Sequence, residues 1–175
     1  MNRHSKDKGI VIKKQKLLNS NYRIVIFSEA KGKLSLFAYG IKKITSRRLS
    51  HLETGNYLTF DYYTKDSHAS LRETELIYGY SKIKTSEEKL EVMFLIFFIL
   101  NKILPEDQPE EAIYKMTLDF LKQLNNKEVT VKEIEAFLTT VLELSGFVDP
   151  ALLNKDTFDV LQFVEELIGQ KIRFR

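Results

Sequence analysis

Two segments near the start of the chain decide the fold: Tyr22-Arg-Ile-Val-Ile-Phe27 and Lys33-Leu-Ser-Leu-Phe-Ala-Tyr39. Both are rich in β-branched and aromatic residues, which favour strands. The link between them, Glu29-Ala-Lys-Gly-Lys33, offers Gly32 where a hairpin turn favours positive φ. The two segments therefore predict an antiparallel β-hairpin.

Three further strand-like segments surround this hairpin, over residues 9–14, 57–63 and 71–78. Within 57–63 every second residue is Leu, Phe or Tyr, as expected of a strand with one buried face. Residues 44–53, between the third and fourth strands, fit a short helix or turn. Five short strands with one helical insert outline a Greek-key barrel of the OB type, and an SH3-like barrel is the competing interpretation.

The second half of the chain has the pattern of helices, because its apolar residues recur every three to four positions. Thr130 with Glu133 has the spacing of a capping box, and so has Thr85 with Glu88. Asp107 is a candidate N-cap for the helix between them. These signals predict a bundle of amphipathic helices.

The predicted fold class is α+β with two domains: an N-terminal five-stranded OB-type β-barrel, then an all-α helical bundle. The barrel domain is expected over residues 1–80, with a flexible tail at 1–8, and the helical domain over 85–175. Residues 1–86 hold 17 Lys and Arg against 7 Asp and Glu, whereas 87–175 hold 10 against 17. Such an asymmetry indicates two modules, of which the basic one meets a polyanion.

Composition and spacing argue against several function classes. The chain has no cysteine, which excludes disulfides and thiol catalysis. The three histidines, His4, His51 and His68, lack the spacing of metal ligands, and no glycine-rich phosphate loop or nucleophile motif is present. The longest apolar run, Val92–Leu100, is too short for a membrane span, and the polar N-terminus has no secretory signal. We therefore expect no enzyme activity, no metal and no cofactor.

Nucleic acid is the polyanion that best fits the basic half, because its cations are interleaved with aromatic residues on strands. We expect Phe27, Phe37 and Phe60 in the barrel core, and Tyr39 and Tyr63 as the rings available for stacking. The full set of residues predicted to contact nucleic acid is Arg23, Lys31, Lys33, Lys42, Lys43, Arg47 and Arg48, with Tyr39 as a stacking ring.

Two short motifs of the strand-rich half are Gly40-Ile-Lys-Lys-Ile-Thr-Ser-Arg47 and Gly9-Ile-Val-Ile-Lys13. The first resembles the Gly-x-Arg/Lys-Arg/Lys-x-x-Ser-Arg stretch of the bacterial RecO recombination-mediator family, and the second resembles that family's first strand. In the helical half, Leu144-Ser-Gly-Phe-Val-Asp-Pro150 resembles a helix end of the family, and Gly169-Gln-Lys-Ile-Arg-Phe-Arg175 its tail.

The chain departs from the family pattern at two places. Family members often carry a four-cysteine zinc insertion after the Gly-Phe-x-Pro segment, and this chain has no cysteine, so zinc is not carried over. Asn19 and Asn21 stand where the family usually has an acidic pair before the second strand.

The resemblance implies a non-enzymatic mediator of recombinational repair in the bacterial cytoplasm, associated with the nucleoid. Such a protein binds single- and double-stranded DNA without sequence specificity, anneals complementary strands, and assists RecA loading on coated DNA. Its partners would be RecR and the C-terminal tail of the single-stranded DNA-binding protein, and none would be a membrane. From the residues alone, an RNA-binding OB-fold protein and a protein-interaction scaffold remain the alternatives.

Overall fold

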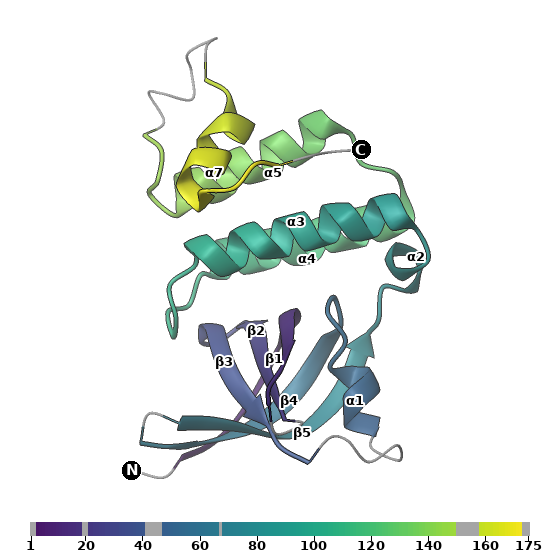
Figure 1. The fold of residues 1–175 in the computed structure, drawn as a ribbon, viewed down its shortest axis with the longest axis vertical. Coiled ribbons are helices and arrows are strands. Elements are labelled where there is room, and N and C mark those ends of the chain that lie inside the picture. The colour runs from purple at the N-terminus through teal and green to yellow at the C-terminus, as the bar shows by residue number, and fades with distance from the viewer. Residues whose placement is uncertain (1–2, 19–20, 41–46, 67, 150–157, 173–175) are drawn as a thin grey trace. The chain divides into compact units, whose positions relative to one another are not determined.

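The computed structural model describes residues 3–18, 21–40, 47–66, 68–149 and 158–172. The strands are β1 (Arg3–Lys16), β2 (Tyr22–Ser28), β3 (Gly32–Ala38), β4 (Tyr57–Lys65) and β5 (His68–Tyr78). The helices are α1 (Arg47–His51), α2 (Ser81–Lys84), α3 (Glu87–Ile103), α4 (Glu111–Asn126), α5 (Val131–Leu144) and α7 (Val160–Ile168) (Figure 1). Among the described residues, no helix is both long and apolar enough to cross a membrane.

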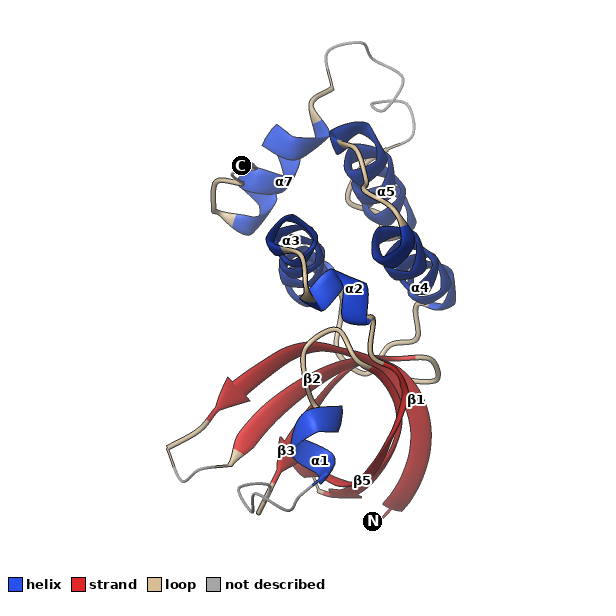
Figure 2. Ribbon diagram, turned by 90° about the vertical axis from the view of Figure 1, so that its right-hand side faces the viewer, coloured by secondary structure: helices blue, strands red, loops and turns tan. Residues whose placement is uncertain are grey.

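The five strands form a closed barrel in the order β1-β2-β3-β5-β4 (Figure 2). All neighbours are antiparallel except β3 and β5, which run parallel; among the described residues their pairing joins Phe37 and Ser70. This order, with α1 between β3 and β4, is that of an OB-type barrel. The OB prediction is confirmed, and the SH3-like alternative is dropped.

The barrel core consists of the side chains that alternate inward from each strand. Its buried members are Val11, Ile24, Ile26, Leu34, Leu36, Ala38, Leu52, Leu58, Phe60, Tyr62 and Leu71. The prediction of a core position is confirmed for Phe60 and wrong for Phe37, which is only half-buried and stands on the outer face between Leu36 and Ala38. Phe27 is fully buried, but its ring packs edge-on against Tyr114 at 5.5 Å, outside the barrel core cluster.

The expected flexible tail at residues 1–8 is wrong for the part that the structure describes. Strand β1 already begins at Arg3, and its residues Arg3–Ile10 pair with β4. The strand then continues along β2 from Gly9 to Lys16, with a register shift between Val11 and Lys13. One long strand thus serves two neighbours, which is how the sheet closes without a free edge.

Helix boundaries follow local capping chemistry. The capping box of Thr130 and Glu133 is confirmed at the start of α5. At α3 the N-cap is Ser86, whose hydroxyl accepts from the Lys89 amide at 3.3 Å, so the predicted role of Thr85 is wrong. Asp107 is not an N-cap either: it has φ of 56°, and α4 begins only at Glu111.

The chain divides into two compact units whose boundary does not simply follow the sequence. One unit contains the barrel, up to Tyr80, together with Pro105–Tyr114. The other contains Ser81–Leu104 and the chain from Lys115 onward. The predicted limits of the domains, 1–80 and 85–175, stay predictions.

Candidate nucleic-acid interface

Neighbouring strands bring a set of side chains together on the outside of the barrel. Ser70 of β5 pairs with Phe37 of β3 on one side and with Tyr63 of β4 on the other. Directly paired residues point to the same side of a sheet, and residues two apart on one strand do so too. His68 and Arg72 therefore share this outer side with Phe37, Ser70 and Tyr63.

The rings of Phe37 and His68 form a cluster with the ring of Tyr39, which directly follows β3. The Phe37 and His68 rings are stacked, with centroids 4.5 Å apart and planes inclined by 15°. Tyr39 lies 6.3 Å from Phe37 at 17°, and its hydroxyl forms a hydrogen bond with His68 Nε2 at 2.6 Å. His68 is exposed and Tyr39 is 46% exposed, so aromatic surface faces solvent.

Cationic side chains surround the rings. Arg23 pairs with Phe37 across β2 and β3, and Lys65 pairs with His68 across β4 and β5. The Arg72 guanidinium lies 5.5 Å from the centroid of the Tyr63 ring, at cation–π distance. We call this set the aromatic–basic face; its members are Arg23, Phe37, Tyr39, Tyr63, Lys65, His68 and Arg72.

An acidic area bounds this face on the barrel. A hollow of about 80 Å³ is lined by Asp61, Glu73 and Glu75, with Lys6 as the one cation among its lining residues. Asp61 stands two residues before Tyr63 on β4, and Glu73 follows Arg72 on β5. A polyanion on the aromatic–basic face is therefore repelled from this hollow.

Two of the predicted contact residues, Arg23 and Lys33, lie beside the segment 106–108. Arg23 donates a hydrogen bond to Ser35 Oγ at 3.0 Å and lies 3.9 Å from Glu106 Oε1. Lys33 is only 8% exposed, because residues 106–108 lie against β3: the Asp107 amide donates to the Lys33 carbonyl at 3.0 Å. Burial lowers the pKa of Lys33, and the negative charge of Glu106 opposes that shift.

The other predicted basic residues are described only in part. Lys31 is exposed in the turn between β2 and β3, where its amide donates to Ser28 Oγ at 3.1 Å. Lys42 and Lys43 lie outside the described residues. Arg47 and Arg48 open helix α1, and only their backbone is described. The eight predicted residues therefore stay a prediction as a set.

Sequence reasoning missed Phe37, Lys65, His68 and Arg72. Phe37 was assigned to the core, and the histidines were considered only as metal ligands. The available signal was the polar–apolar alternation of His68-Ala-Ser-Leu-Arg72, which extends the fifth strand three residues before its predicted start at Leu71. The alternation predicts which side chains of β5 face outward, but it does not indicate which residues of β3 and β4 lie beside them.

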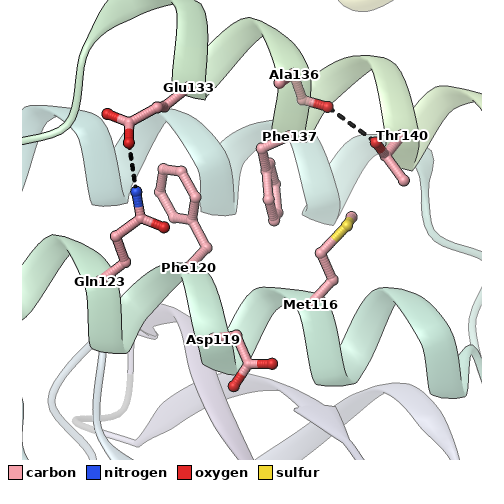
Figure 3. Close-up of a pocket in the computed structure, with 8 residues that line it drawn as sticks. All are labelled: Met116, Asp119, Phe120, Gln123, Glu133, Ala136, Phe137 and Thr140. Carbon is pink, nitrogen blue, oxygen red and sulfur yellow. Dashed lines mark hydrogen bonds between the residues drawn. The ribbon is translucent and has the colours of Figure 1, made fainter.

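Two hollows lined by described residues of the helical unit differ in chemistry. A groove of about 370 Å³ between α4 and α5 has Met116, Phe120 and Phe137 between the two helices, and Asp119 and Glu133 among its lining residues (Figure 3). The Asp119 carboxylate points away from α5. The second hollow, of about 120 Å³, lies between α3 and the chain after α7. Its lining residues are Glu91, Leu95, Phe98, Ile168, Gln170, Lys171 and Ile172.

Glu133 in the first groove is held ionised by its neighbours. Lys127 Nζ donates to its carboxylate at 2.7 Å, and the Thr130 amide donates at 2.8 Å. These two contacts lower the pKa of Glu133 to about 2. The rim of the α4–α5 groove therefore keeps this negative charge at neutral pH, paired with Lys127.

Comparison with known proteins gives consistent matches. Residues 1–80 match the family model described as "Recombination protein O N terminal". A protein of Listeria monocytogenes serotype 4b named DNA repair protein RecO is 25% identical over 157 residues, which cover 87% of this chain and 61% of that protein. Proteins of the same name from Acetivibrio thermocellus and Clostridium acetobutylicum are 24% identical over 143 residues, or 81% of this chain.

The fold and the aromatic–basic face define an OB-fold protein with an appended helical domain. The matches above make the chain similar to one family: the model of the RecO N-terminal domain matches its barrel, and relatives named DNA repair protein RecO align with most of its length. It spans about three fifths of the length of the curated relatives it matches.

Proposed function

We propose that this chain acts in DNA repair as a recombination mediator that binds DNA through its barrel. The observation that carries the proposal is the aromatic–basic face, which lies on the strands and beside the β4–β5 connection that OB folds use to bind oligonucleotides. The names of the relatives support the role in repair.

A face of this kind suits sequence-independent binding. Cations neutralise phosphates and release condensed counterions, and contacts to the backbone carry no sequence information. By screening two like-charged strands, the barrel would lower the repulsion that slows annealing of complementary strands. This role needs no catalytic residue and no cofactor.

A binding titration at two salt concentrations tests the DNA proposal. With roughly five phosphates contacted, affinity for a labelled mixed-sequence single strand should fall about a hundredfold from about 50 to 200 mM salt. An RNA of the same sequence, titrated in parallel, separates DNA binding from the RNA-binding alternative. Absence of binding to DNA at the lower salt would refute the proposal and favour a protein-interaction scaffold.

For the helical unit we propose docking of the acidic, Phe-ended tail of single-stranded DNA-binding protein between α3 and the end of α7. An acidic peptide with an apolar terminus needs an apolar hollow beside a cation. That hollow has Leu95, Phe98 and Ile168 as apolar walls and Lys171 at its edge, and Lys102 Nζ lies 5.7 Å from the Phe98 ring. Glu91 also lines this hollow, but Lys171 balances it, whereas the lining of the α4–α5 groove has two carboxylates, Asp119 and Glu133, and no lysine or arginine.

Calorimetry with a synthetic tail peptide tests this docking site. Lys171→Glu should weaken binding of the peptide severalfold, because it replaces the attracting cation at the hollow by a carboxylate. Lys122→Glu, an exposed lysine on α4 paired with Asp119 at 3.0 Å, is the matched control and should leave binding unchanged. Equal loss in both variants would mean that only the net charge matters and would refute the site.

The wider role places the chain with RecR in loading RecA onto coated DNA in the bacterial cytoplasm, at the nucleoid. The assay that tests it is annealing of two complementary oligonucleotides coated with single-stranded DNA-binding protein, with and without RecR. Failure to anneal under both conditions would refute the mediator role.

A further inference from the structure

The ring cluster on the barrel can distinguish single-stranded from double-stranded DNA, whereas the cations cannot. In a duplex the bases stack on one another, so a protein ring gains nothing from their faces, whereas a single strand offers each base for stacking. Phosphates are present in both forms. A surface of rings therefore contributes to binding of the single strand alone.

The ring cluster is preorganised for the stacking of bases. The hydrogen bond of 2.6 Å between the Tyr39 hydroxyl and His68 Nε2 joins two exposed rings, and the stacked Phe37 ring, with its centroid 4.5 Å from that of His68, supports them. Rings held in place lose less conformational entropy when a ligand binds. Their three planes lie within 30° of one another, as a row of stacked bases requires.

Cations stand where the phosphates of a stacked strand would run. Arg23 is the cross-strand neighbour of Phe37, and Lys65 is the cross-strand neighbour of His68. A third cation, Arg72 on the same strand as His68, lies over the ring of Tyr63 on β4. This alternation of rings and cations matches a chain of alternating bases and phosphates, and matches neither an acidic peptide, which lacks bases, nor a duplex, which hides them.

We infer that Phe37, Tyr39 and His68 form a base-stacking platform through which the barrel prefers single-stranded over double-stranded DNA. The inference rests on the proposed DNA binding and adds to it the form of DNA that this face selects. It assigns a role to two residues, Phe37 and His68, that their sequence context does not suggest.

The test compares one double variant on three ligands. Tyr39→Ala with His68→Ala removes two exposed rings without touching the barrel core. Anisotropy titrations use a labelled single strand, its blunt duplex, and a strand of the same length in which most sugars are abasic, all at the same salt concentration. The matched control is Phe94→Ala, which removes an exposed ring (51% exposed) on α3.

The double variant should lose on the order of tenfold in affinity for the single strand. Its affinity for the duplex and for the abasic strand should stay within about twofold of the unaltered chain, as should the dependence of binding on salt, because phosphate contacts remain. Phe94→Ala should change none of these affinities.

Two results would overturn the inference. An equal loss on the single strand and the duplex would mean that the rings act only by supporting the cations, and an unchanged single-strand affinity would mean that no base stacks there. Failure of the unaltered chain to bind any of the three ligands is a different outcome, because it refutes the DNA proposal itself. Circular dichroism of the double variant checks that the barrel remains folded.

Discussion

Replacing Glu106 by glutamine is expected to strengthen DNA binding. The carboxylate lies 3.9 Å from the Arg23 guanidinium, so it occupies a cation of the barrel that a phosphate would otherwise contact. Glutamine has the same shape, and its carbonyl still accepts the Ser35 hydroxyl hydrogen bond, which is 3.4 Å long in the unaltered chain. The substitution therefore changes one charge and little else.

The size of the effect follows from Coulomb's law. The Arg23 and Glu106 side chains are 44% and 56% exposed, so their interaction is screened by water. A phosphate about 6 Å from the carboxylate would be repelled by about 0.7 kcal/mol in water, and physiological salt about halves that value. Affinity should therefore rise about two- to threefold at low salt and less as salt increases.

The assay is an anisotropy titration of Glu106→Gln, in parallel with Glu128→Gln, an exposed glutamate of the helical unit. The control removes the same charge from the chain, so it corrects for the change in net charge. A rise only in Glu106→Gln supports phosphate contact at Arg23. Unchanged or weaker binding would refute the reasoning and exclude this cation from the interface.

Three further predictions concern the loop cations, the barrel turn and pH. Lys42→Glu with Arg47→Glu should abolish strand annealing at an unchanged melting temperature, whereas Lys122→Glu with Lys132→Glu should not; normal annealing by the first pair would show that the wrong face was chosen. Gly32→Ala should reduce the free energy of unfolding by at least about 2 kcal/mol and so lower the melting temperature. The reason is that φ is +69° and a Cβ would stand 1.7 Å from the Gln108 carbonyl oxygen. Gly40→Ala, with φ of +67°, measures the backbone strain alone, so equal losses would contradict the collision. Glu133→Gln should be less stable than the unaltered chain at neutral pH. The pKa of Glu133 in the folded chain, about 2, lies below its ordinary value of 4.5. The stability contributed by the carboxylate is therefore present above pH 4.5 and is lost as pH falls toward 2. Thermal melts across that range check this, and a difference that persists at pH 2 would contradict it.

Local signals predicted the elements of the chain well. The hairpin of β2 and β3 follows from two strand-like segments around Gly32, and the start of α5 follows from the capping box at Thr130. Each signal depends on residues a few positions apart, whose chemistry is complete within one turn or one strand. Boundaries were less reliable where a neighbour far along the chain decides them, as at Arg3, which belongs to a strand because β4 pairs with it.

The sequence predicted that the barrel carries a basic and aromatic surface, but it did not indicate which of these residues are neighbours. A basic, aromatic barrel followed from composition, and Tyr39 was correctly expected to be exposed. Lys33 was expected to be available and is 8% exposed, because residues 106–108, which come after α3, lie against its strand. Nothing near Lys33 in the sequence indicates that contact.

By itself, the order of residues determined that this chain has a basic strand-rich half and an acidic helical half, and that side chains alternate between the two faces of each strand. Only the tertiary structure decided which outward side chains are neighbours. Phe37 and His68 stack because β3 and β5, separated along the chain by α1 and β4, meet at the pairing of Phe37 with Ser70. Alternation is a local property of the backbone, whereas register between distant strands is set by closure of the whole barrel.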